Sequence, residues 1–507
     1  MMAIMHEGLI TDWLAYHAKW RGNALACVDL QTERRFTYAD MYSRSSRLAG
    51  GLKVKFDVGP GDRVMVLARN STDVFEIMFS CWRLGAVFMP ANWRLTAPEL
   101  EAIIADCDPT LIIADEEFCG GVATGPAKQL SRSASGENSP YEELIAGAES
   151  EAAFAPTTLD TINTLLYTSG TTGEPKGVIC TWRMTMLAVI QAAASGRLST
   201  ETRTLTHVPL FHTAGLNGFA TPLFHYGGAV HVMRNWDPEA CLRYLTDEEL
   251  GITHTLGVPT QFLMMAQHES FKEAVFSSIE WAGIGGAPAT LDLLQTWGAK
   301  GLQLCPSYGM TEVFGVTRLP PERAKEKLGS VGWPVMYCNI RILDSNGNLC
   351  PPATSGEIQL KGPGVTPGYW KKPELTAAAI SEDGWFSTGD IGYQDEDGAL
   401  FVIDRLKDMY ISGGENVYPA EVENIISSFG EVKQVAVIGA PDPKWGEVGV
   451  AVVVLKPEKQ LTIAEIQNRC IANLAPYKIP ARVAFTDSLP LSAQGKVLKT
   501  ELRKSYV

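Results

Sequence analysis

A run of hydroxyls and glycines with one lysine, between Tyr167 and Val178, has the composition of a polyphosphate-binding loop. Glycines let a backbone approach phosphate oxygens closely, exposed N–H groups and hydroxyls donate to those oxygens, and a lysine supplies positive charge. The run follows an apolar stretch, so we place it in a loop after a strand. The residues to which we assign this role are Thr168, Ser169, Gly170, Thr171, Thr172, Gly173 and Lys176.

This loop is not one of the two common phosphate-binding motifs. The Walker A spacing G-x-x-x-x-G-K-[ST] is not matched, and no stretch gives G-x-G-x-x-G after a strand. The sequence therefore disfavours a P-loop ATPase or kinase, which would release phosphate or form ADP.

The ordered string from Tyr167 to Val178 resembles the signature of the adenylate-forming superfamily, which includes acyl-CoA synthetases, peptide-synthetase adenylation domains and luciferases. The chain looks most like feruloyl-CoA synthetases and bacterial fatty-acid–CoA ligases. The resemblance implies that ATP activates a carboxylic acid as an acyl adenylate, and that coenzyme A then takes the acyl group. Further motifs follow in the family's order at Pro209–His212, Gly285–Pro288, Tyr308–Glu312, Gly384–Asp390, Asp404–Asp408, Gly413–Asn416 and Gln494–Lys496.

The resemblance gives individual polar residues a role in adenylation. Attack of a carboxylate on the α-phosphate brings anions together, so the site must neutralise the charge that builds there. Glu312 is expected to hold Mg²⁺, Thr311 to donate to the α-phosphate, and Lys496 to bridge the acid and the phosphate. Asp390 is expected to bind both ribose hydroxyls, a task that suits two acceptor oxygens, and Arg405 to contact the ribose.

The adenine and acyl positions also follow from the resemblance. Small residues would let adenine lie against the backbone at Gly285, Gly286 and Ala287, with Tyr308 and Gly309 also assigned to nucleotide binding. His212 would lie at the acyl pocket and the thiol path, although a lone histidine between apolar segments is as readily a core residue. No role is carried onto Trp182, where many members have histidine.

The residues matched to the acyl pocket carry no charge, so a second carboxylate there would lack a cationic partner and cost several kcal/mol. We therefore expect a monocarboxylic acid with an uncharged tail. A medium- or long-chain fatty acid and an aryl or phenylpropenoic acid both stay open. The matched residues are Thr213, Ala214, Gly215, Val258, Gly283, Ile284 and Met310.

Coenzyme A is the expected thiol acceptor. The chain ends soon after Lys496 without a carrier domain, which favours a free cofactor, although a stand-alone adenylation enzyme that loads a separate carrier protein stays open. The resemblance also implies that the C-terminal domain rotates about Lys407 between the two reactions. The residues expected on the coenzyme A side are Gly413, Gly414, Trp445, Tyr477 and Lys478.

The elements that must position these residues indicate an α/β fold. A chain of 507 residues exceeds one compact core, because single cores stop growing near about 250 to 300 residues. Apolar runs at Val64–Leu67 and Leu111–Ala114 alternate with an amphipathic stretch at Val74–Leu84, which predicts layers of strands and helices. Residues 120–156, rich in Gly, Ser and Ala, predict a surface connection.

The second half of the chain predicts a β-rich region followed by a small α+β domain. Asn346-Gly347 and Asp397-Gly398 lie between apolar runs and predict hairpins. Apolar residues at helical spacing after Pro419 predict an amphipathic helix, and Thr462 with Glu465 forms a capping-box pattern. We predict an adenylating domain of layered α/β subdomains over residues 1–404 and a mobile domain over residues 405–507.

Composition excludes several other classes of protein. Lys and Arg number 43 against 57 Asp and Glu, and the net charge of -14 gives no electrostatic reason to bind nucleic acid. Ten scattered cysteines and an N-terminus without signal-peptide character predict a reducing cytoplasm. The uncharged stretch between Arg203 and Arg234 is interrupted by Pro and Gly, so we predict buried core and no transmembrane segment. A homodimer stays open.

Overall fold

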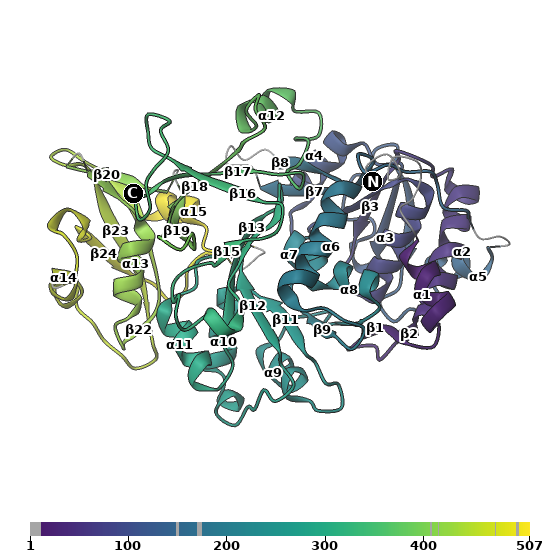
Figure 1. Cartoon of the computed structure of the whole chain (residues 1–507), viewed down its shortest axis with the longest axis horizontal. Coiled ribbons are helices and arrows are strands. Elements are labelled where there is room, and N and C mark those ends of the chain that lie inside the picture. The colour runs from purple at the N-terminus through teal and green to yellow at the C-terminus, as the bar shows by residue number, and fades with distance from the viewer. Residues whose placement is uncertain are drawn as a thin grey trace.

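The protein is described by a computed structural model that covers residues 12–148, 152–169, 175–405, 408–413, 415–471, 473–492 and 496–507. The described residues form four β-sheets with helices packed against them, which confirms the predicted α/β fold. In Figure 1 the chain runs from the N-terminal layers on the right to the C-terminal sheet on the left.

The first sheet has six strands and forms the N-terminal layer. Its strands are parallel except that β7 and β8 pair antiparallel. The predicted apolar runs lie in β3 and β5, and the predicted amphipathic stretch lies in α3. The strand order is β6 (Lys128–Arg132), β5 (Leu111–Asp115), β3 (Arg63–Leu67), β4 (Val87–Pro90), β7 (Ile162–Ser169) and β8 (Pro175–Thr181). Helices of this region are α1 (Trp13–Arg21), α2 (Tyr38–Phe56), α3 (Thr72–Leu84), α4 (Ala97–Cys107) and α5 (Pro140–Ala146).

The prediction of a surface connection over residues 120–156 was wrong. The segment contains the edge strand β6 and the helix α5, and both Arg132 and Tyr141 are fully buried. The reason is tertiary, because β6 pairs with β5 and Arg132 forms ion pairs with two buried aspartates. Local composition gives no sign of these distant partners.

The second sheet has nine strands, and several of the predicted site motifs lie at its strand ends. The strand order is β15 (Trp333–Pro334), β14 (Phe314–Arg318), β13 (Leu304–Met310), β12 (Trp281–Gly285), β11 (His254–Gly257), β9 (Arg203–Thr206), β10 (Ala229–Val232), β1 (Leu25–Asp29) and β2 (Arg35–Thr37). Helices of this region are α6 (Trp182–Gly196), α7 (Thr213–Gly215), α8 (Thr221–Tyr226), α9 (Pro238–Thr246), α10 (Pro259–Gln267) and α11 (Leu291–Ala299).

The uncharged stretch between Arg203 and Arg234 lies inside this second layer. Its α8 side chains Leu223 and Phe224 are fully buried, as predicted for a core segment. In the part of the chain that the structure describes, no helix has the length and apolar character needed to cross a membrane.

Two antiparallel sheets complete the fold, and both predicted hairpins are confirmed. Asn346-Gly347 joins β16 to β17 and Asp397-Gly398 joins β18 to β19. The four-stranded sheet has the order β16 (Asn339–Leu343), β17 (Gly356–Lys361), β18 (Phe386–Gln394) and β19 (Leu400–Arg405), with α12 (Pro373–Ala379) beside it.

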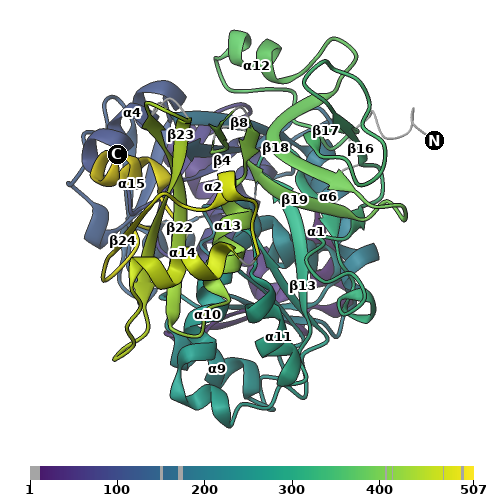
Figure 2. The same ribbon diagram turned by 90° about the vertical axis from the view of Figure 1, so that its left-hand side faces the viewer.

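The C-terminal sheet lies in front of the larger layers in Figure 2. The predicted amphipathic helix is α13, which buries Val422 and Ile426, and the predicted capping box precedes α14. The strand order is β21 (Glu415–Val417), β20 (Tyr410–Ser412), β23 (Gly446–Leu455) and β22 (Val432–Asp442), with β24 (Arg482–Phe485) also pairing with β23. Its helices are α13 (Pro419–Ser427), α14 (Ile463–Ile471) and α15 (Lys499–Tyr506).

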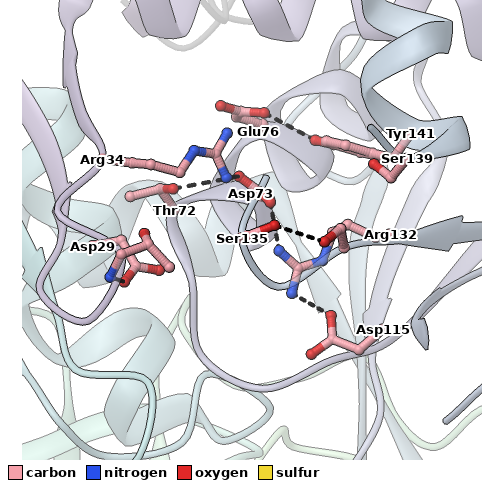
Figure 3. Close-up of polar contacts among 12 residues, drawn as sticks. Asp29, Arg34, Thr72, Asp73, Glu76, Asp115, Arg132, Ser135, Ser139 and Tyr141 are labelled. Atoms are coloured by element: carbon pink, nitrogen blue, oxygen red, sulfur yellow. Dashed lines mark hydrogen bonds and ion pairs between the residues drawn. The ribbon is translucent and has the colours of Figure 1, made fainter. Parts of the chain in front are cut away.

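A buried ionic network joins the first sheet to the β1–β2 hairpin of the second (Figure 3). Asp73 at the start of α3 lies between two guanidinium groups, pairing with Arg34 at 2.8 Å and with Arg132. Burial alone would raise the pKa of Asp73, but the arginines hold it below its ordinary value. Arg132 also pairs with Asp115, which in turn lies 2.7 Å from Arg234.

Replacing Arg132 with Leu should lower the free energy of unfolding by about 3 to 5 kcal/mol, because Asp73 and Asp115 would stay buried without this cation. Urea unfolding followed by circular dichroism measures the change. Arg183→Leu is the control, because its pair with Asp160 is partly exposed and is expected to contribute about 1 kcal/mol or less. Equal losses in the two variants would contradict a stabilising role for the network.

Candidate active site

Three residues predicted from separate motifs meet on the four-stranded sheet. Asp390 in β18 lies opposite Arg405 in β19, and its Oδ1 is 3.3 Å from the Arg405 Nε. The Tyr308 hydroxyl donates to the Asp390 Oδ2 at 2.6 Å. Burial, followed by the charge of Asp390, raises the pKa of Tyr308, so the phenol stays protonated as a donor. The sheet thus presents an oriented carboxylate flanked by an arginine.

Close backbone packing explains the glycines predicted near adenine. A Cβ on Gly285, at the end of β12, would lie 2.8 Å from the Ser307 Oγ. A Cβ on Gly309 would lie 2.2 Å from the Phe314 carbonyl oxygen of the neighbouring strand. Gly286 has φ of +79°, and Ala287 follows it in the loop. At Gly285 and Gly309 the neighbouring strands leave no room for a side chain, so the backbone there stays bare.

Glu312 and Thr311 occupy the turn between β13 and β14. The Glu312 Oε1 accepts a hydrogen bond of 2.9 Å from the Tyr369 hydroxyl, and its carbonyl oxygen accepts one of 2.8 Å from the Thr366 N–H. Tyr369 belongs to none of the motifs seen in the sequence, because its signal is a contact between segments 57 residues apart.

Lys176 lies on β8, the strand that follows the phosphate loop, and Thr168 lies opposite it on β7. The Lys176 Nζ is 5.6 Å from the centroid of the Tyr369 ring. Lys176 and Glu312 therefore contact the same tyrosine, which brings two predicted motifs together. Gly170, Thr171, Thr172 and Gly173, together with the Ser169 side chain, lie outside the described residues.

Lys496 reaches from the C-terminal part of the chain to the end of β12. Its Cε lies 3.9 Å from the point where a Cβ on Gly286 would stand, and Val258 Cγ1 lies 3.5 Å from the same point. His212 precedes α7 nearby, and burial, followed by the charges of Lys496 and Arg94, lowers its pKa to about 3. His212 is therefore a neutral imidazole at neutral pH.

The predicted acyl residues line only part of one small cavity. Its volume is about 10 Å³, and a Cβ on Gly283 would lie 2.7 Å from Leu256 at its wall. Thr213 begins α7 beside this cavity, whereas Ile284 is 1% exposed in the core and Met310 packs against the β-rich cluster. The cavity is lined by Thr204, Leu205, Thr206, Val208, Ala214, Gly215, Phe219 and Leu256, none of which is charged.

A larger, cationic cavity of about 380 Å³ lies beside the segment that leads to His212. The guanidinium groups of Arg69 and Arg94 lie 4.3 and 4.9 Å from the ring centroid of Trp93. Scattered arginines carry no motif, so the sequence gives no sign of this cavity. It is lined by Arg69, Asn70, Trp93, Arg94, His207, Pro209, Arg234, Asn235 and Trp236.

The residues expected on the coenzyme A side of the C-terminal domain lie in two groups. Gly413 donates to the Trp445 carbonyl oxygen at 2.8 Å, and a Cβ on Gly413 would lie 2.9 Å from the Trp445 ring. Tyr477 packs against the C-terminal core, and the Lys478 Nζ pairs with Glu421 at 2.7 Å. Lys407 and Gly414 lie outside the described residues.

Comparison with known proteins accounts for this arrangement. Residues 14–370 match the AMP-binding enzyme family, and residues 421–496 match its C-terminal domain. The chain is 40% identical to a feruloyl-CoA synthase from Amycolatopsis over 93% of this chain and 94% of that protein. It is 34% identical to a long-chain-fatty-acid–CoA ligase from Mycobacterium tuberculosis over 95% of each.

The structure also resembles a Bacillus subtilis o-succinylbenzoate CoA synthetase holding its acyl adenylate, with a TM-score of 0.87, 32% identity and 97% and 98% of the two chains covered. The chain belongs to the AMP-binding enzyme family. It is an AMP-forming acid–thiol ligase that uses ATP, Mg²⁺ and coenzyme A.

The carboxylate found here fits the way this AMP-binding enzyme must hold its metal. Mg²⁺ usually binds one or two carboxylates together with substrate phosphates, and it keeps several waters. No cluster of three or more His, Cys, Asp or Glu side chains suited to a metal occurs among the described residues. Glu312, which lies near the phosphate-loop cation Lys176, is thus suited to a cation that the phosphates also coordinate.

Buried histidines should make the stability of this AMP-binding enzyme fall in acid. Burial lowers the pKa of His207 and of His231 to about 4, so the unfolded chain binds more protons below pH of about 6.5. Between pH of about 6 and 4, His231→Asn should reduce the pH dependence of the unfolding free energy by up to about 1.4 kcal/mol per pH unit. Urea unfolding at several pH values measures the slope, and an unchanged slope would contradict the assignment.

Proposed function

We propose that this enzyme converts an uncharged-tail monocarboxylic acid to its acyl adenylate with release of pyrophosphate, and then transfers the acyl group to coenzyme A. The observation that carries the proposal is the approach of Lys496 to Gly286, beside His212. A cation from the C-terminal part of the chain thus lies between Gly286 of the proposed adenine loop and His212 of the proposed acyl site, where acid and α-phosphate would meet. Such a cation is needed only for adenylation.

Each neighbouring group would then have one task. Asp390 binds the ribose hydroxyls, and Arg405 pairs with that carboxylate and contacts the ribose, as their ion pair supports. Thr311 donates to the α-phosphate, and Lys496 stabilises the charge that develops on it. Bound Mg²⁺, held by Glu312, supplies further positive charge to the phosphate oxygens. The close-packed glycines leave a flat surface for adenine.

The uncharged lining of the small cavity beside Ala214 and Gly215 supports an uncharged acyl tail, and this space of about 10 Å³ would have to widen to admit one. Its lining offers apolar and hydroxyl groups, so a second carboxylate would lose hydration without gaining a cation. Relatives named for ferulate and for long-chain fatty acids support an aryl or phenylpropenoic acid and a medium- or long-chain fatty acid equally. Thr213, Val258, Gly283, Ile284 and Met310 complete the proposed acyl site.

The cationic cavity supports coenzyme A as the acceptor. Arg69, Arg94 and Arg234 surround a space of about 380 Å³ that Trp93 and Trp236 also line. Arg69 pairs with Glu117 and Arg234 with Asp115, so a phosphate of coenzyme A would share these guanidinium groups with the two carboxylates. Arg94 also lies close enough to His212 to lower its pKa, which connects the cavity with the acyl site. Gly413, Gly414, Trp445, Tyr477 and Lys478 would form the other wall.

The organisation of the molecule follows from this proposal. We place the domain border between residues 404 and 405 and the hinge at Lys407. Rotation of the C-terminal domain about this hinge would withdraw Lys496 from the site and bring the coenzyme A side of the domain toward it. The Asp404 carboxylate accepts a hydrogen bond of 2.9 Å from the Ala420 N–H at the start of α13, which supports a defined adenylating arrangement. We further propose a cytoplasmic enzyme without nucleic-acid partners, and a homodimer stays open.

The proposed reaction can be tested with a panel of aliphatic, aryl and phenylpropenoic acids, supplied with ATP, Mg²⁺ and coenzyme A. We expect AMP, pyrophosphate and an acyl thioester from at least one acid class, because the phosphate chemistry is adenylation. Chromatography of nucleotides and thioesters measures all three products. ADP as the main product, or a thioester only with a carrier protein, would contradict the proposal.

Lys496→Ala should slow acyl adenylate formation by about 100- to 1000-fold, the usual loss for one preorganised charge-stabilising donor. Thioester formation from a supplied acyl adenylate should change little, because Lys496 serves only the first step. Single-turnover assays of each half-reaction separate the two effects. Equal impairment of both would show that Lys496 acts as a general structural residue.

Arg94→Gln should raise the KM for coenzyme A by about tenfold or more, because one charge-assisted hydrogen bond to a phosphate would be lost. Pyrophosphate release without coenzyme A should stay within about twofold of the unmodified enzyme, since the nucleotide lies elsewhere. Arg183→Gln is the control, because its partly exposed pair with Asp160 lies outside both cavities. If Arg94→Gln slows adenylation and leaves the KM for coenzyme A unchanged, the cationic cavity does not bind coenzyme A.

A further inference from the structure

A short segment, Thr366–Trp370, connects the strand after the phosphate loop to the turn that carries Glu312. The segment runs along β8, where the Ile179 N–H donates to the Gly368 carbonyl oxygen at 3.1 Å and the Trp370 N–H donates to that of Gly177 at 2.7 Å. At its other end, the Thr366 N–H donates to the Glu312 carbonyl oxygen at 2.8 Å. Backbone hydrogen bonds thus connect the segment to β8, which carries Lys176, and to the turn that carries Glu312.

The side chains of the segment strengthen this connection. Thr366 is 2% exposed, and its hydroxyl bonds to the carbonyl oxygens of Ile179 and Gly368 at 2.7 and 2.9 Å. The Tyr369 N–H donates to the hydroxyl of Thr376 in α12 at 3.0 Å. The backbone around Tyr369 is therefore fixed by hydrogen bonds to β8 and to α12, and its side chain lies between Lys176 and Glu312.

Tyr369 contacts one charged group of each motif. Its hydroxyl donates to the Glu312 Oε1 at 2.9 Å, and its ring face lies 5.6 Å from the Lys176 Nζ. Within the described part of the chain, the second Glu312 oxygen, Oε2, accepts no hydrogen bond, which leaves it available to a cation.

We propose that Tyr369 is a positioning residue that orients the metal-binding carboxylate of Glu312 and the phosphate-binding ammonium of Lys176 relative to each other. The proposal rests on the roles proposed above for Glu312 and Lys176. The hydroxyl fixes the rotamer of Glu312 through one oxygen, because a single donor leaves the other oxygen for the cation. The ring face attracts the ammonium and limits the places it can occupy.

These two contacts can be removed separately. Tyr369→Phe keeps the ring and removes only the hydroxyl, so it should raise the Mg²⁺ concentration for half-maximal adenylation by about tenfold, with the KM for ATP within about twofold. Tyr369→Leu removes the ring as well and should in addition raise the KM for ATP by about three- to tenfold. Pyrophosphate release at varied Mg²⁺ and ATP measures both quantities.

Three further variants decide how the result is interpreted. Tyr393→Phe is the matched control, because this partly buried tyrosine stacks on Phe401 in the four-stranded sheet and should leave the Mg²⁺ dependence unchanged. Glu312→Gln should itself raise the Mg²⁺ requirement. The double variant with Tyr369→Phe and Glu312→Gln should show no further increase, because the hydroxyl acts through the carboxylate.

The outcomes separate this proposal from the one on which it rests. If Glu312→Gln shifts the Mg²⁺ dependence and Tyr369→Phe does not, the metal role stands and the positioning role of Tyr369 is overturned. If Glu312→Gln leaves the Mg²⁺ dependence unchanged, both are overturned. A tenfold shift in Tyr369→Phe that disappears in the Glu312→Gln background supports both roles, since a loss of general stability would persist there.

Discussion

Hydrogen bonds between the Thr366–Trp370 segment, β8 and the Glu312 turn fix the position of β8, which carries Lys176, relative to Glu312. Adenylation brings a carboxylate against a triphosphate, so catalysis depends on opposing charge that is already in place when the anions meet. Two further sets of contacts join segments that lie far apart in the chain. Tyr308 and Arg405 both contact Asp390, and Lys496 reaches the loop at Gly286 from the other end of the chain.

Close backbone packing provides the second condition for the site. Gly285 and Gly309 lie where a Cβ would collide with the neighbouring strand, so the strand ends remain flat and accessible. The buried pairs of Asp73 and Asp115 with Arg132 are joined to the second sheet through Arg34, which pairs with Asp73. The same network continues through Asp115 to Arg234 at the cationic cavity, which links the stability of the core to the position of an arginine that faces the cavity.

Local patterns in the sequence determined the α/β class, both hairpins and the helix α13, because periodicity, Asn-Gly and Asp-Gly turns and a first-turn proline act within a few residues. Ordered motifs likewise identified the family and marked Glu312, Asp390 and Lys496 as polar residues of one site. The family itself is established by matches that cover most of the chain, whereas the individual roles remain predictions.

Only the tertiary structure decided which of these residues meet and through which contacts. The interpretation of residues 120–156 as a connection was wrong because Arg132 depends on Asp73, which lies 59 residues away in the chain. Tyr369 could not be identified from the sequence, because its hydrogen bond to Glu312 and its ring contact with Lys176 form only when distant segments are brought together by the fold. Long-range pairing carries no local signal, since each contact depends on the spatial meeting of segments that are independent in sequence.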